Sequence, residues 1–178
     1  VTRAIRHQAS RGLTYMLPTA DALEVGHLLT ETFGDFRWQI ATTATDANRF
    51  ALRVARAATG RSKYLKFDGH FHGLAEQWLF KRSDPFDQSS PIVPSSDGVP
   101  CHLASDIVMV PWNDADAFEK AMNEHRDELA AVICEPIHYN AGCIPPAPGF
   151  LELLRERTKD HGAVLIFDEV LSGFRTSA

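Results

Sequence analysis

The sequence predicts an α/β fold in which helices flank a mostly parallel sheet. Strand-like runs alternate with helix-like segments of about ten to fifteen residues, which is the order that strand–helix–strand units produce. The five runs are residues 37–42, 63–68, 107–110, 131–134 and 163–167. The last run, Ala-Val-Leu-Ile-Phe, holds no polar residue and is typical of a strand buried on both faces. A chain of 178 residues is expected to form one domain over residues 1–178.

The first strand–helix pair has a clear local pattern. Residues 37–42 are expected to form a short strand. The segment 45–59 is expected to form a helix whose apolar face consists of Ala47, Phe50, Ala51, Val54, Ala55 and Ala58. Gly60 stands where a helix end favours a residue of positive φ, and residues 63–68 predict the second strand.

The middle of the chain is expected to be rich in loops over residues 73–105. Prolines interrupt any long element there, at Pro85, Pro91, Pro94 and Pro100. A third strand is expected at residues 107–110, where the chain becomes apolar again.

Two helix–strand pairs complete the pattern. Asp114 is expected to cap a helix that carries on one side Phe118, Ala121, Met122, His125 and Leu129. The strand 131–134 follows. Pro148 is expected to open the next helix, with Phe150, Leu151 and Leu154 pointing inward, and Gly162 to end it before the strand 163–167.

Composition excludes several classes of function. The 18 basic and 23 acidic residues give a net charge of −5, which argues against nucleic acid as a partner. The chain contains no run of 18 apolar residues, so no membrane span is predicted. The first residues lack the apolar core of a signal peptide. Cys101, Cys134 and Cys143 form no CxxC motif, so a reducing compartment, the cytoplasm, is expected.

Asp168 is the first candidate for a functional residue, because it directly follows the apolar strand 163–167. Burying a carboxylate is costly unless donors or a cation meet it, and ligands of open α/β sheets bind at such strand ends. The alternative is an acid in a surface loop or at a helix cap.

A second candidate is the segment Thr42-Thr43-Ala44-Thr45, which lies between the first strand and the Ala-rich helix. Unpaired N–H groups and the positive end of the helix dipole make such a helix start an anion site. The alternative, which base rates favour, is ordinary N-capping by Thr43 or Thr45.

A third candidate is Gly69-His70-Phe71-His72-Gly73. On a strand, His70 and His72 would share one side, as metal ligands do, but no third ligand stands at a recognisable spacing and no metal is predicted. Phe71 is expected either to stack on a planar ligand or to fill the core.

Two weaker patterns follow later strands. Asn140 precedes Ala141-Gly142 and its amide could donate to a ligand oxygen, although Asn near Gly is also common in ordinary turns. The run Val-Leu-Ile-Phe-Asp-Glu is similar to a Walker B strand, but neither GxxxxGK[ST] nor GxGxxG is present, so nucleotide hydrolysis is a minor alternative.

Six segments stand in the same order as the motifs of one enzyme family. They are Thr-Ala-Thr-Asp-Ala at 43–47, the helix 53–61 ending in Thr-Gly-Arg, Phe-His-Gly at 71–73, Glu-Pro with Asn-Ala-Gly at 135–142, Pro-Pro with Pro-Gly-Phe-Leu at 145–151, and Leu-Ile-Phe-Asp-Glu-Val at 165–170. Together they resemble the class III aminotransferases, which use pyridoxal 5′-phosphate (PLP), and within them the glutamate-1-semialdehyde aminomutase-like branch. The resemblance implies the large domain of a fold type I PLP-dependent transferase.

The resemblance also implies roles for site residues. Asp168 would pair with the nitrogen of the PLP ring, Phe71 and Val170 would cover the two ring faces, and Asn140 would bond the phenolic oxygen. The PLP phosphate would lie at the helix start, held by Thr43, Ala44 and Thr45. Leu171 stands where many class III enzymes have Gln, which favours the aminomutase-like branch.

The chain departs from the family pattern in three ways. Ala44 replaces a Gly and would be strained if that position required a positive φ, and Asp46 replaces a Glu. The Schiff-base lysine of the family lies a few dozen residues beyond the position of Asp168, where this chain has already ended. The chain is therefore expected to be an incomplete large domain, without the small domain and without a catalytic residue of its own.

The function that the resemblance implies for the parent protein is transfer or intramolecular exchange of an amino group through Schiff-base intermediates. Its substrates would be small amino acids, amines or keto compounds, and it would be a homodimer, whereas the 178-residue chain alone would be inactive. The alternatives are a non-catalytic binding protein with the same fold and, less favoured, a nucleotide-binding α/β domain.

Overall fold

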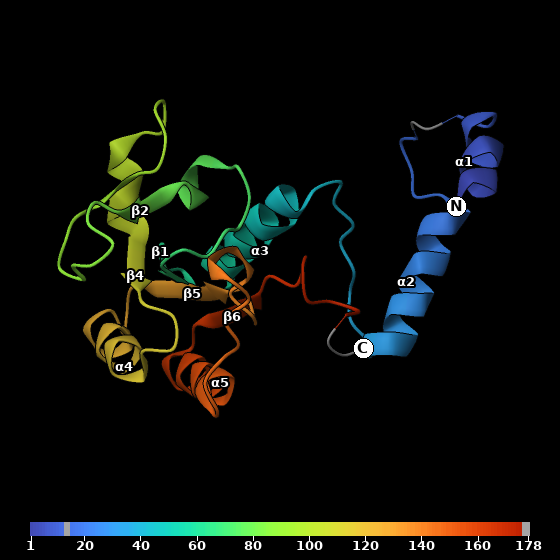
Figure 1. Cartoon of the computed structure of the whole chain (residues 1–178). Helices are drawn as coiled ribbons and strands as arrows, with labels where there is room; N and C mark the ends of the chain where they lie inside the picture. The colour runs from blue at the N-terminus through green and yellow to red at the C-terminus, as the bar shows by residue number, and fades with distance from the viewer. Residues whose placement is uncertain (13–14, 176–178) are drawn as a thin grey trace. The chain divides into compact units, whose positions relative to one another are not determined.

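The computed structural model describes residues 1–12 and 15–175 (Figure 1). It divides into two compact units, Val1–Ile40 and Ala41–Ala178. The first unit holds helices α1 (Thr2–Ala9) and α2 (Ala20–Phe33), neither of which has a buried residue. Thr19 caps α2 by accepting a hydrogen bond from the N–H of Ala22. Neither helix was predicted from the sequence.

The strand predicted at residues 37–42 does not form. A strand needs a neighbouring backbone, and this segment pairs with no other described residues. Its one large ring turns back to α2 instead: Trp38 packs near Phe33 and Phe36, and its Nε1–H donates to Thr30 Oγ1 at 3.0 Å. Trp38 therefore packs with helix α2 and not in a sheet.

The second unit contains a four-stranded parallel sheet, which confirms the predicted fold class. The strand order is β4-β1-β5-β6, and each neighbouring pair is parallel. The strands are β1 (Lys63–Phe67), β4 (Ile107–Val110), β5 (Leu129–Cys134) and β6 (Val164–Phe167). They lie within two residues of the last four predicted runs.

Helices cover both faces of this sheet (Figure 1). Helix α3 (Ala44–Thr59) packs on one face through Leu52 and Ala55, which join a core cluster with Tyr64 and Ile133. Helices α4 (Ala115–Glu124) and α5 (Phe150–His161) pack on the other face, against a cluster that contains Leu65, Phe67 and Val132. Successive residues of a strand point to opposite faces, so Tyr64 and Leu65 belong to different clusters.

The predicted helix ends are largely confirmed. Gly60 and Gly162 end α3 and α5 at φ of 69° and 66°, and Asp114 caps α4 by accepting from the N–H of Ala117 at 2.9 Å. Two details differ. Helix α4 stops at Glu124, so His125 is only its C-cap and Leu129 belongs to β5. Helix α5 begins at Phe150 behind Gly149, two residues after the proline expected to open it.

The loop-rich stretch 73–105 contains short elements only. A two-stranded antiparallel hairpin pairs β2 (Phe80–Arg82) with β3 (Ile92–Pro94). Two 3₁₀ segments flank it, η1 (Glu76–Trp78) and η2 (Cys101–Asp106), and a third, η3 (Tyr139–Ala141), follows β5. No helix in the described part of the chain is long and apolar enough to cross a membrane.

Strand β6 is not buried on both faces, which corrects the prediction for residues 163–167. It lies at the edge of the sheet, and Val164 and Phe167 are 36% and 41% exposed. By contrast, every residue of β5 is buried, because strands and helices surround it on all sides. An apolar run predicts that a strand exists, but neighbours decide whether it is covered.

Candidate functional site

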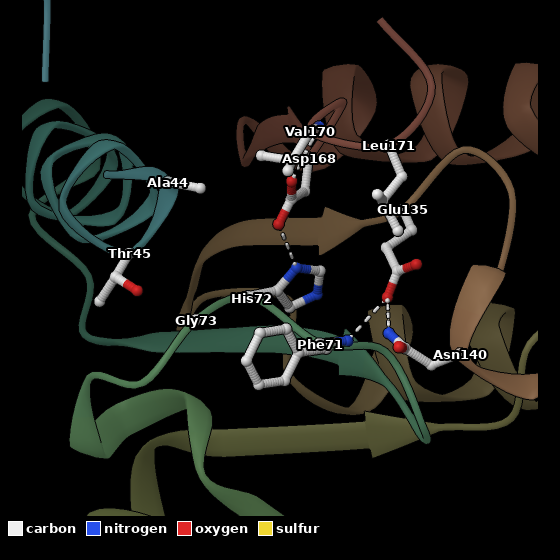
Figure 2. A pocket seen from close by; sticks show the side chains of 10 residues that line it. All are labelled: Ala44, Thr45, Phe71, His72, Gly73, Glu135, Asn140, Asp168, Val170 and Leu171. Carbon is white, nitrogen blue, oxygen red and sulfur yellow. Dashed lines mark hydrogen bonds and ion pairs between the residues drawn. The ribbon is translucent and has the colours of Figure 1, made fainter. Parts of the chain in front are cut away.

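A pocket of about 270 Å³ opens at the carboxyl ends of the strands, beside the first turn of α3 (Figure 2). The sequence placed seven candidate residues here, and six of them line this pocket: Ala44, Thr45, Phe71, Asn140, Asp168 and Val170. The other lining residues are His72, Gly73, Glu135 and Leu171. Thr43, the seventh candidate, is not among them. The carboxyl ends of parallel strands are the usual place for a ligand in an open α/β sheet.

Asp168 lies on the inner wall of the pocket and is 8% exposed. Its Oδ2 accepts hydrogen bonds from Asn48 Nδ2 at 2.7 Å and from His72 Nδ1 at 3.0 Å. Among the described residues, its Oδ1 accepts from the N–H of Val170 alone, at 3.3 Å. The carboxylate is thus held firmly on one oxygen, while the other still has room for a donor.

Asp168 carries a negative charge beside partners that are neutral. Burial alone would raise the pKa of Asp168, but the hydrogen bonds from His72 and Asn48 bring it below the ordinary value. Burial also lowers the pKa of His72, more than the hydrogen bond to Asp168 raises it. The imidazole is therefore neutral at pH 7 and donates its Nδ1–H. In the described residues no Lys or Arg forms an ion pair with Asp168.

The start of α3 forms the opposite side of the pocket. Thr43 is the N-cap: its Oγ1 accepts from the N–H of Asp46 at 3.1 Å and donates to Asp46 Oδ2 at 3.0 Å. Its hydroxyl is therefore used within the helix, as the capping alternative predicted. Thr45 differs, because its Oγ1 accepts from the N–H of Leu74 at 3.1 Å and keeps its own proton for another acceptor.

The backbone at Ala44 is unstrained. The non-glycine residues with positive φ in the described part of the chain are Asn113, Cys143 and Phe174, so the strain expected for Ala44 does not arise. Ala44 and Thr45 open the first helical turn, where N–H groups have no acceptor within the helix. Gly73 has φ of +106°, and a Cβ there would lie 2.8 Å from Thr45 Cα, so only glycine allows this close approach.

Two apolar side chains flank the space in front of Asp168. In Figure 2 the Phe71 ring lies below and Val170 above it, and they are 51% and 55% exposed. Exposed aromatic and branched side chains at a pocket are typical of walls that cover a flat ligand.

The motif His70-Phe71-His72 does not form the strand that a shared metal site would need. The two imidazoles have separate protein partners: His70 Nδ1 accepts from the N–H of Glu135 at 3.0 Å, and His72 Nδ1 donates to Asp168. The described residues contain no cluster of three or more metal-ligating side chains.

The sequence analysis assigned no cofactor-binding role to Asn48, His72 or Glu135, although His72 lies in the candidate segment 69–73 and Glu135 in the segment 135–142. Glu135 directly follows β5 as Asp168 follows β6, and that parallel was available in the sequence. Asn48 is a polar residue near the apolar face of the helix 44–59, and an amide that is buried there needs a hydrogen-bond partner. His72 gave no signal that pointed to Asp168, because the two are 96 residues apart.

The chain matches the model of one protein family, described as "Aminotransferase class-III", over residues 1–177. It is 43% identical over 176 residues to a glutamate-1-semialdehyde 2,1-aminomutase from an Exiguobacterium species, covering 98% of this chain and 40% of the relative. The chain therefore spans about two fifths of the length of the curated relatives that it matches.

Solved structures agree with this match. An omega-transaminase from Sphaerobacter thermophilus is 35% identical, with a TM-score of 0.87 over 96% of this chain and 40% of its own. A glutamate-1-semialdehyde-aminomutase variant from Pseudomonas aeruginosa PAO1, in complex with PMP, is 43% identical, with a TM-score of 0.83 over 96% of this chain and 37% of its own.

Proposed function

The chain belongs to the class III aminotransferase family, and on that premise we propose that it is the PLP-binding part of an aminomutase or aminotransferase. In this proposal, residues 1–178 are an incomplete large domain of fold type I. The parent protein moves an amino group between small amino acids, amines or keto compounds.

The observation that carries the proposal is the state of Asp168. A buried carboxylate without a cationic partner is costly, and its Oδ1, which accepts one bond from the N–H of Val170, has room for the protonated nitrogen of a pyridine ring. His72 and Asn48 hold Oδ2 and so keep the carboxylate in one orientation. When bound, PLP supplies an electron-withdrawing ring that stabilises negative charge on the substrate carbon next to the amino group.

The phosphate would lie at the start of α3. In the part of the chain that the structure describes, the N–H groups of Ala44 and Thr45 and the Thr45 hydroxyl proton have no acceptor, and the helix dipole adds to their effect. Thr43 would contribute by holding the first turn in place and not through its hydroxyl, because Asp46 already takes that proton.

The ring would lie between Phe71 and Val170, and the amide of Asn140 would face its phenolic oxygen. All three residues line the pocket together with Asp168, which supports a single flat ligand in contact with all of them. The walls would exclude water from the ring, and the polar groups would fix its direction.

This chain alone would bind the cofactor without completing a reaction. No lysine is among the described residues that line the pocket, and the family reaction needs one. Lys66 lies nearby in β1, but it is buried and its Nζ donates to the carbonyl oxygen of Trp78. The reactive lysine would therefore come from a part of the parent protein outside these residues.

The parent protein is further proposed to be a cytoplasmic homodimer. The exposed apolar side chains of Val164 and Phe167 in β6 support a contact of this strand with another subunit or with the rest of the parent protein. The three cysteines are all free, which fits a reducing compartment.

Ligand-linked thermal stabilisation of the 178-residue chain tests the cofactor proposal. PMP is the better probe beside PLP, because it has no aldehyde that would react with surface lysines. A ligand at a hundred times its Kd adds about 2.7 kcal/mol to the free energy of unfolding, so the midpoint should rise. Asp168→Ala should lose most of this rise, whereas Asp97→Ala, an exposed loop acid, should keep it. If neither compound stabilises the unmodified chain, the proposal fails.

A further inference from the structure

Glu135 is a buried acid that the roles proposed above do not use. It directly follows β5, is 4% exposed and lines the pocket beside Asn140. Its own N–H donates to His70 Nδ1 at 3.0 Å, which ties the end of β5 to the segment after β1. In the described residues it forms no ion pair with Lys or Arg.

The Glu135 carboxylate joins two segments of the pocket wall. Its Oε1 accepts from the N–H of Phe71 at 2.7 Å and from Asn140 Nδ2 at 3.2 Å, and its Oε2 accepts from the N–H of Tyr139 at 3.2 Å. Figure 2 shows the bonds to Phe71 and Asn140 side by side. Phe71 belongs to the segment after β1, whereas Tyr139 and Asn140 belong to η3, so one side chain fixes both.

The polarity of these contacts determines how Asn140 is oriented. All three partners of Glu135 are N–H donors, and a carboxylate can only accept. The Asn140 amide must therefore turn its nitrogen toward Glu135, which leaves its second N–H as a donor for the pocket. The same oxygen anchors the backbone of Phe71 and so sets the place of the ring.

We infer that Glu135 is a positioning residue, which holds Phe71 and Asn140 in the orientation that binds the PLP ring. This inference rests on the proposed function, because it assumes that the pocket takes PLP. Glu135 itself would not touch the ligand, and its effect would pass through Asn140 and Phe71.

The direct test is Glu135→Gln, which keeps the shape and changes the polarity. Whichever way the new amide is turned, its NH₂ group faces at least one of the three N–H donors. We expect PMP affinity to fall about tenfold, the equivalent of one strong hydrogen bond. Glu152→Gln, an exposed acid on α5, should leave the affinity unchanged. Circular dichroism without ligand verifies that each variant is folded.

A double-mutant cycle separates positioning from a general loss of structure. PMP affinity is measured for the unmodified chain, E135Q, N140A and E135Q/N140A. If Glu135 acts through Asn140, the tenfold loss should shrink to about threefold or less when Asn140 is already absent, since only the Phe71 contribution remains. An equal loss in both backgrounds, or no loss with E135Q, overturns the inference.

Glu135→Asp keeps the test decisive if E135Q does not fold. This variant keeps the negative charge but moves the carboxylate back by one methylene group. Its loss of PMP affinity should therefore also be smaller in the N140A background than in the unmodified chain. An Asp variant that binds as tightly as the unmodified chain refutes the inference. Absence of PMP and PLP binding by the unmodified chain is a different result, because it refutes the proposed function itself.

Discussion

Strands β5 and β6 are neighbours with similar apolar sequences, and each is followed by an acid, yet they differ in how completely this chain covers them. Every residue of β5 is buried, whereas Val164 and Phe167 of β6 are exposed. Glu135 and Asp168 each accept three hydrogen bonds, two on one oxygen and one on the other, but backbone N–H groups bond both oxygens of Glu135 and only Oδ1 of Asp168. The first strand is thus closed within this chain, and the second is partly open.

The difference indicates how to separate structural from ligand-binding acids. Both carboxylates are buried at strand ends, so burial does not distinguish them. The number of donors does not distinguish them either, but the kind of donor does, because a side chain can turn or reverse its hydrogen bond and a backbone N–H cannot. On this ground Glu135 belongs to the framework, and Asp168 is the group that would meet the ligand in the proposed function.

Matched truncations in the two strands should give the largest effect. Val132→Ala in β5 removes two fully buried methyl groups and should lower the free energy of unfolding by about 2–3 kcal/mol. Val164→Ala in β6 should cost less than about 1 kcal/mol, because that side chain is already 36% exposed. Denaturant unfolding measures both. Equal costs would mean that β6 is covered in solution, for instance by a second copy of the chain.

The two acids should differ in the same way in the absence of ligand. Glu135→Gln should cost about 2 kcal/mol, because backbone N–H groups bond both carboxylate oxygens and the new NH₂ group must face one of them. Asp168→Asn should cost about 1 kcal/mol or less, since a backbone N–H bonds only Oδ1, and the side chains of His72 and Asn48 can accept from the new NH₂ group in their other tautomer or amide orientation. Urea unfolding of the two variants beside the unmodified chain gives the comparison. The reverse order would contradict this distinction between backbone and side-chain donors.

His70, which accepts a hydrogen bond from the N–H of Glu135, should make the stability of the folded chain depend on pH. Burial, followed by the neighbouring His138, His72 and Lys66, lowers the pKa of His70 to about 2. Below pH 6.5 the unfolded chain therefore takes up a proton at this residue that the folded chain refuses, so stability falls as the pH falls. From pH 7 to 5.5 this residue alone should cost roughly 1.3 kcal/mol.

The variant His70→Asn isolates that contribution. Its amide oxygen can accept from the N–H of Glu135 as the imidazole does, but it does not titrate. Urea unfolding at pH 7 and at pH 5.5 should show a smaller difference between the two pH values for the variant than for the unmodified chain. The same difference in both proteins would mean that His70 is protonated in the folded state.

Most of the fold and much of the pocket could be predicted from local patterns. Four of the five strands predicted from apolar runs form, although β2 and β3 were not predicted, and Gly60, Gly162 and Asp114 marked helix ends because cap chemistry is local. The strand at 37–42 was wrong, since pairing depends on a partner that the segment itself does not encode. His72 and Asn48 were missed for the same reason, as their bonds to Asp168 span 96 and 120 residues.

The two threonines at the start of α3 repeat the contrast on a smaller scale. Thr43 has its hydroxyl satisfied within the helix, so Thr43→Ala should lower stability by about 1 kcal/mol and leave PMP affinity nearly unchanged. Thr45 keeps its proton for the pocket, so Thr45→Ala should weaken PMP binding severalfold and affect stability less. Paired melting and PMP titrations of the two variants distinguish the roles. If Thr43→Ala were the variant that lost affinity, the Thr43 hydroxyl of the unmodified chain would have to release Asp46 and bind the phosphate. The N-cap would then be part of the ligand-binding site.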